Sequence, residues 1–92
     1  MKKYVIERDM PRVGDKTPEE LCQAAAHSNE VLSGLGSGIH WLESFVTRDK
    51  IFCVYVADDE GKVREHAEKS GFPANSVREV RTILDPSSAL GA

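Results

Sequence analysis

Four side chains of the chain are of types that bind transition metals and lie in segments with strand character. They offer an imidazole, a thiol and two carboxylates, from His40, Cys53, Glu7 and Glu79. Imidazole, thiolate and carboxylate are ligands that nickel, zinc and copper accept. No local spacing such as His-x-x-x-His brings two of them together, so they would have to converge from separate strands or across a dimer. The other interpretation is an interface with buried side-chain hydrogen bonds.

Two further histidines lie on expected helices. His66 is at the edge of the apolar stripe of a helix expected from about residue 60 to 70, which predicts a half-buried ring. It is either a packing histidine bonded to a backbone carbonyl, or a metal ligand or general base near neutral pH. His27 lies off the stripe of the earlier helix and is expected to be solvated. We therefore take Glu7, His40, Cys53 and His66 as the candidate metal ligands.

Other motifs indicate little chemistry. A nucleophilic Cys53 would need a partner base and an electropositive setting, so a structural or interfacial thiol is the simpler interpretation. Cys22 and Cys53 are far apart with no Cys-x-x-Cys pair, which indicates neither a disulfide framework nor a structural zinc site. The Gly34-x-Gly36-x-Gly38 run follows a helix and precedes a strand, the reverse of a phosphate-binding loop. Nucleotide binding is therefore not expected.

The elements that would position these residues follow the order β-α-β-β-α-β. Apolar and β-branched runs predict strands over 3–9, 39–47, 51–57 and 76–84. Thr17-Pro18-Glu19-Glu20 is typical of a capping box at a helix start, and Gly34 and Gly71-Phe72-Pro73 predict helix ends. This order predicts an α+β, ferredoxin-like fold, with a four-stranded antiparallel sheet and both helices on one face. The other face stays open.

The hairpin decides which side chains share that open face. If Arg48-Asp49 is a two-residue turn, Ser44 lies opposite Cys53 and Leu42 opposite Tyr55; a three-residue loop exchanges the two sets. We favour the two-residue turn because it turns the more apolar set toward the helices, namely Trp41, Phe45, Phe52, Val54 and Val56, together with Glu43. Tyr4 and Ile6 are expected to face the helices too. The open face then collects His40, Leu42, Ser44, Val46, Ile51, Cys53 and Tyr55, with Glu7, Val77 and Glu79 beside them.

Composition limits the functional classes. The 92 residues carry 12 Lys and Arg against 15 Asp and Glu, a formal net charge of -3. This length predicts one domain over residues 1–92, small enough that a second copy often covers part of its surface. The acidic balance argues against nucleic acid as a partner. No stretch is apolar enough for a membrane span or a signal segment, so a cytoplasmic protein without a membrane partner is expected.

Several motifs resemble those of one small bacterial family. They are Trp41-x-x-Ser44, Cys53-Val54-Tyr55-Val56-Ala57, Arg64-Glu65-His66-Ala67-x-x-Ser70-Gly71-Phe72-Pro73, Val77-x-Glu79-Val80 and Tyr4-Val5-Ile6-Glu7-Arg8 followed by Met10-Pro11. The chain is similar over nearly its whole length to a nickel-binding ferredoxin-like family, formerly a domain of unknown function. It departs from the pattern at Val56, where an acidic residue is common, and at Asp58, where a proline is usual. The resemblance implies a homodimer that binds nickel without known catalysis. It marks Trp41, Ser44, Cys53, Tyr55 and His66 as motif positions, and we take Trp41, Ser44 and Tyr55 as ligand-contacting.

The leading hypothesis is a dimeric, non-enzymatic protein that binds a divalent metal such as nickel, for sequestration or sensing. The alternative is an enzyme or small-molecule carrier whose cavity lies between two open sheet faces and is lined by Ser44, Cys53 and Tyr55. A third hypothesis is an interaction module whose open face is filled by the second copy and leaves no pocket.

Overall fold

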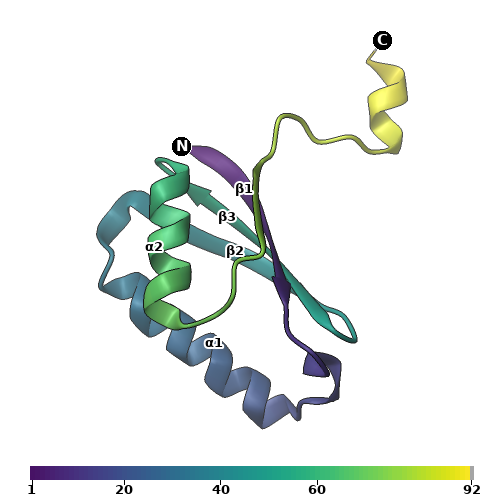
Figure 1. Ribbon diagram of the computed structural model, residues 1–92. Coiled ribbons are helices and arrows are strands. Elements are labelled where there is room, and N and C mark those ends of the chain that lie inside the picture. Colours follow the sequence, from purple (N-terminus) through teal and green to yellow (C-terminus); the bar gives the residue numbers. More distant parts are fainter. Residues whose placement is uncertain (92) are drawn as a thin grey trace.

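The sheet and its two helices form in the predicted order. A computed structural model describes residues 1–91, with β1 (Lys2–Asp9), α1 (Pro18–Ser33), β2 (Ile39–Val46), β3 (Lys50–Ala57), α2 (Glu60–Ser70) and β4 (Ser76–Glu79). The strands are antiparallel in the order β2-β3-β1-β4. Both helices pack on one face of this sheet (Figure 1). The ferredoxin-like α+β fold is therefore confirmed.

Local signals place the helix ends where the sequence predicts them. At the start of α1, the Thr17 hydroxyl accepts a hydrogen bond from the Glu20 amide at 3.2 Å, and the Glu20 carboxylate accepts one from the Thr17 amide at 3.0 Å. At the start of α2, the Asp59 side chain accepts from the Lys62 amide at 3.0 Å. These contacts satisfy amides that a helix start leaves without a partner. The predicted capping box is confirmed.

The glycine that ends α2 provides a test of this local control. Gly71 has φ 79° and nothing within 4 Å of an added Cβ, so Gly71→Ala is expected to cost about 1 kcal/mol through backbone strain alone. Gly34, after α1, has φ -83° and is the matched control, because alanine adopts that conformation freely. Urea denaturation of both variants measures the difference. Equal midpoints for Gly71→Ala and Gly34→Ala would show that the φ value does not matter.

The hairpin between β2 and β3 is predicted correctly near its turn and wrongly further along. Ser44 lies opposite Cys53, and the Thr47 amide donates to the Lys50 carbonyl across the two-residue turn at 2.8 Å. A bulge between Trp41 and Glu43 then shifts the register, so that Trp41 lies opposite Tyr55. The expected pairing of Leu42 with Tyr55 is wrong because Leu42 is the extra residue of the bulge, and it is 51% exposed.

The expected assignment of sheet faces is also wrong. Tyr4 lies opposite Tyr55 and Ile6 opposite Cys53, so β3 must turn these two side chains toward the helices, where Tyr4 and Ile6 lie as predicted. Ser44 follows Cys53 to the same face, as do Val46, Ile51 and Val77. The open face instead carries the set expected to face the helices, namely Glu43, Phe45, Phe52, Val54 and Val56. Trp41 remains on the helix side because the bulge shifts it by one residue.

The last strand is shorter than predicted. β4 ends at Glu79, opposite Tyr4, where only two residues of β1, Lys2 and Lys3, remain to pair with a longer strand. The chain then leaves the body of the domain and ends in a short 3-10 turn at Pro86–Leu90 (Figure 1). This C-terminal arm, residues 81–91, exposes three large side chains, Ile83, Leu84 and Leu90. Within residues 1–91, no helix combines the length and apolar character of a membrane span.

Candidate functional site

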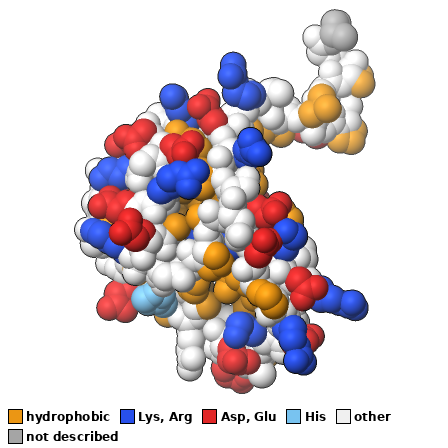
Figure 2. Space-filling model, in the orientation of Figure 1, with side chains coloured by type: hydrophobic (Ala, Val, Ile, Leu, Met, Phe, Trp, Pro, Cys, Tyr) orange, Lys and Arg blue, Asp and Glu red, His pale blue; other side chains and the backbone are white. Residues whose placement is uncertain are grey.

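A cavity of about 630 Å³ lies between α1 and the helix-facing side of the sheet. This volume falls in the range of roughly 300 to 1,000 Å³ that is typical of small-molecule sites. Figure 2 shows hydrophobic side chains exposed between α1 and the nearby ends of the strands, where the cavity opens. Its walls are mainly apolar and include Met10, Val13, Leu21, Trp41, Ile51 and Phe72.

The polar part of this cavity is built around Arg8, which is 2% exposed. Its Nη1 donates to the Pro73 carbonyl at 2.7 Å, and its Nη2 to the Tyr55 hydroxyl at 3.4 Å. Its Nε donates to the Cys53 sulfur at 3.4 Å. None of the ion pairs formed by residues 1–91 includes Arg8, so this buried guanidinium has only neutral acceptors.

The Cys53 thiol is held by a chain of hydrogen bonds from β2. Trp41 Nε1 donates to Ser44 Oγ at 2.9 Å, and Ser44 Oγ donates to Cys53 Sγ at 3.0 Å. Arg8 Nε approaches the same sulfur from β1. Trp41, Ser44, Cys53 and Tyr55, all candidates from the sequence, thus lie together in one cavity wall. They lie under α1, whereas the sequence placed Ser44, Cys53 and Tyr55 on the open face.

His66 is fully buried behind this wall, whereas the sequence predicted a half-buried ring. Its ring lies 5.4 Å from that of Tyr55, and its Nε2 hydrogen bonds with Ser28 Oγ at 3.1 Å. Burial, with a smaller effect of the Arg8 charge, lowers the pKa of His66 to about 4, so the ring is neutral at pH 7. Burial also raises the pKa of the Tyr55 phenol. Within the described residues, His66 Nδ1 has no hydrogen-bond partner.

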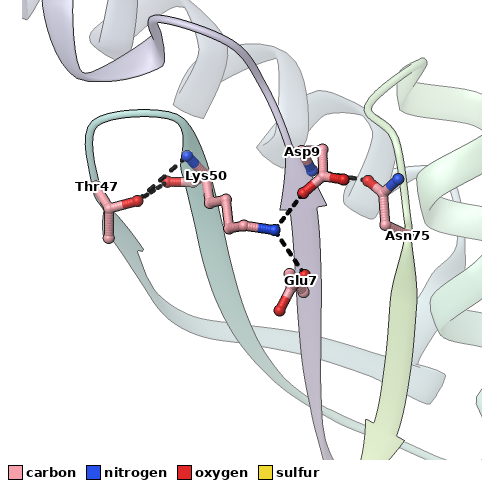
Figure 3. A network of polar contacts seen from close by, with 5 residues as sticks. All are labelled: Glu7, Asp9, Thr47, Lys50 and Asn75. Atoms are coloured by element: carbon pink, nitrogen blue, oxygen red, sulfur yellow. Dashed lines mark hydrogen bonds and ion pairs between the residues drawn. The ribbon is translucent and has the colours of Figure 1, made fainter.

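Glu7 and His40 lie on the open face, on the other side of the sheet from Cys53. Figure 3 shows Lys50 reaching from β3 to two carboxylates of β1. Its Nζ lies 2.8 Å from Glu7 Oε2 and 2.6 Å from Asp9 Oδ1. Hydrogen bonds to Asp9 and Glu7 raise the pKa of Lys50, so the ammonium stays charged. Glu7 is thus already paired with a cation, which it shares with Asp9. His40 is exposed, at the other end of the same face.

The described residues of one copy do not suit a nickel ion. Within residues 1–91, no group of three or more His, Cys, Asp or Glu side chains could hold a metal. The Arg8 guanidinium next to Cys53 would repel a cation bound at that sulfur. Glu7, His40, Cys53 and His66 therefore do not meet within one subunit.

Sequence reasoning did not single out Arg8 as a functional residue. The signal was available, because Arg8 alternates with Tyr4 and Ile6 on β1, and both were expected to face the helices. Charged residues are rarely buried, so an arginine is not normally assigned to the core from sequence.

Comparison with known proteins identifies the family. The family model described as "Nickel responsive protein SCO4226-like" matches residues 4–80. The chain belongs to this family. One solved structure of the SCO4226-like type, reported as SCO4226 from Streptomyces coelicolor A3(2), has a TM-score of 0.74 and 18% sequence identity, and the alignment covers 89% of this chain and 99% of that one. This likeness shows the shared fold. A search of curated proteins finds no significant match. The SCO4226-like family name indicates a nickel-responsive protein.

Proposed function

We propose that this protein binds nickel as a homodimer, in a sequestering or sensing role, and that residues of both copies hold the ion at the open sheet face. The observation that carries this proposal is that His40 and Glu43 lie on that face, and neither makes a side-chain hydrogen bond or ion pair within residues 1–91. Among residues 1–91 of one subunit, no three His, Cys, Asp or Glu side chains lie close enough together to hold a metal ion. A site shared between copies supplies the missing ligands.

The open face has the character of a dimer interface. Its centre is formed by five apolar side chains that no helix covers, Val5, Phe45, Phe52, Val54 and Val56. Phe45 is 54% exposed. An antiparallel sheet tolerates water on one face, but a contiguous apolar face of this kind is typical of a protein interface. The exposed side chains of the C-terminal arm, which leaves the body of the domain, can pack on the same second copy.

Twofold symmetry would double each ligand. In a closed dimer the same surface patch contributes from both copies. His40 and Glu43 lie on the edge strand β2, so an axis near this strand brings together two imidazoles and two carboxylates. Nickel accepts this combination of nitrogen and oxygen ligands. The proposal therefore needs no ligand from the cavity, where Arg8 opposes a cation.

Calorimetric titration with nickel chloride tests this proposal. His40→Ala and Glu43→Gln are each expected to weaken nickel binding by at least about tenfold, a change of 1.4 kcal/mol. His27→Ala removes an exposed imidazole from α1 and is the matched control, expected to leave nickel affinity unchanged.

A monomeric variant separates the shared site from a site within one copy. Phe45→Glu places a charge on the open face and is expected to give a folded monomer by light scattering that has lost its nickel affinity. The proposal is overturned if the monomer binds nickel as well as the parent protein does, or if Cys53→Ser and His66→Asn abolish binding while His40→Ala does not.

A further inference from the structure

We propose that the cavity under α1 binds a small apolar molecule with one carboxylate group, and that this carboxylate pairs with Arg8. This inference does not depend on nickel, because the cavity lies on the opposite side of the sheet from His40 and Glu43. It rests on three features of the cavity: an incompletely satisfied buried charge, apolar walls, and a single cationic group at its inner end.

The first feature is the bonding of Arg8. Hydrogen bonds from a guanidinium to oxygen are usually about 2.7 to 2.9 Å long when strong. Only the bond to the Pro73 carbonyl, at 2.7 Å, is of this kind. The contacts of the guanidinium with Phe72 O and Tyr55 Oη are longer, at 3.5 and 3.4 Å, whereas the 3.4 Å contact with Cys53 Sγ is of ordinary length for the larger sulfur atom. Buried charges are normally paired, so Arg8 retains the capacity to bind an anion on its cavity side.

The second feature is the apolar wall. The cavity is lined mainly by side chains such as Val13, Leu21 and Ile51, with the rings of Trp41 and Phe72 among them. Phe72 also packs against the guanidinium, whose Cζ lies 5.9 Å from the ring centre. A ligand that fills this space is therefore apolar over most of its surface. Small alanines of α1, Ala24 and Ala25, form part of the opposite wall and leave the space open.

The third feature is the small number of charges. Arg8 is the one buried cation of the cavity, and Ser44 and Tyr55 are neutral hydroxyl neighbours. A phosphate dianion would exceed what one guanidinium neutralises, whereas a carboxylate matches it in charge and in its two-oxygen geometry. Lys16 and Glu20 lie at the exposed rim, where the Glu20 carboxylate is held by the Thr17 amide in the helix cap. Glu20 therefore does not take the place of the ligand at Arg8.

Calorimetry with matched probes tests the proposal and distinguishes two kinds of apolar body. Octanoate represents a chain and 2-naphthoate a ring system, and 1-octanol and 2-naphthalenemethanol are their neutral counterparts. At least one acid is expected to bind tenfold or more tightly than its alcohol. Arg8→Met, which replaces the unbranched stem of the side chain but removes the guanidinium charge, is expected to remove this preference, and Arg8→Lys to retain part of it.

A second variant keeps the test valid if Arg8→Met does not fold. Ala24→Phe fills the cavity from α1 and leaves the Arg8 side chain unchanged, and it is expected to reduce binding of the acid at least tenfold. Ala26→Phe adds the same ring to an exposed position of α1 outside the cavity and is the control. If neither acid binds, if acid and alcohol bind equally, or if Ala24→Phe has no more effect than Ala26→Phe, the proposal is wrong. His40→Ala should leave acid binding unchanged, so this result and the nickel result are independent.

Discussion

The folded state is expected to lose up to about 3 kcal/mol of stability as the pH falls from about 6.5 to about 4, and His66 is the cause. Burial lowers the pKa of this ring to about 4 from an ordinary value of 6.5. Between these two values the unfolded chain binds a proton at His66 and the folded chain does not. Where the unfolded state binds more protons than the folded state, lowering the pH reduces the free energy of unfolding. The contribution of His66 is therefore complete above about pH 6.5 and decreases below it.

Chemical denaturation at about pH 7 and about pH 4.5 measures this effect. His66→Asn keeps a polar group next to Ser28 but does not titrate, and its free energy of unfolding should fall less between the two pH values than that of the parent protein. Carboxylates titrate in the parent protein and in the variant alike, so subtracting one loss of stability from the other removes their contribution. An equal loss of stability in the parent and in His66→Asn would refute the assignment to His66.

Local chemistry made the elements of the fold predictable. The capping box at Thr17 and Glu20, the glycine after α2 and the two-residue turn are each specified by a few neighbouring residues. The pairing of Ser44 with Cys53 follows directly from that turn. Such signals do not depend on the rest of the chain, and the order of elements they give leads to the ferredoxin-like arrangement.

The choice of sheet face could not be made from apolarity. Both faces of the sheet carry large apolar side chains, and the face under the helices also buries the charged Arg8. The more apolar set of hairpin residues in fact lies on the open face. The pairing of Tyr4 with Tyr55 resolves the question, but it joins residues far apart in the sequence. The bulge at Leu42 shifts by one residue the alternation of side chains between the two faces of β2. No turn or glycine within the strand indicates this bulge.

The candidate site was predicted in part. Trp41, Ser44, Cys53 and Tyr55 were singled out by their resemblance to family motifs, and the structure brings them together with Arg8, which was not. The sequence groups Glu7 and His40 with Cys53 because all three are side-chain types that bind transition metals. Ligand type says nothing about which side of a sheet a residue occupies, and strand parity separates them.

Replacing Ile6 by alanine is expected to cost about 2 to 5 kcal/mol of folding free energy, the range for an aliphatic side chain in a core. Ile6 is 0% exposed at the centre of β1, opposite Cys53 on one side and Val77 on the other. Alanine leaves a void under both helices that this close-packed core cannot easily fill. Urea denaturation at low protein concentration measures the loss.

The neighbouring residue provides the control and connects stability with assembly. Val5→Ala removes apolar surface from the opposite face of the same strand, where Val5 is half-buried in one copy. It should cost about 1 kcal/mol or less in the unfolding of the monomer, yet weaken self-association measured by sedimentation. Equal losses of folding stability for Val5→Ala and Ile6→Ala would mean that both faces are core. Unchanged self-association in Val5→Ala would mean that the second copy does not cover this face.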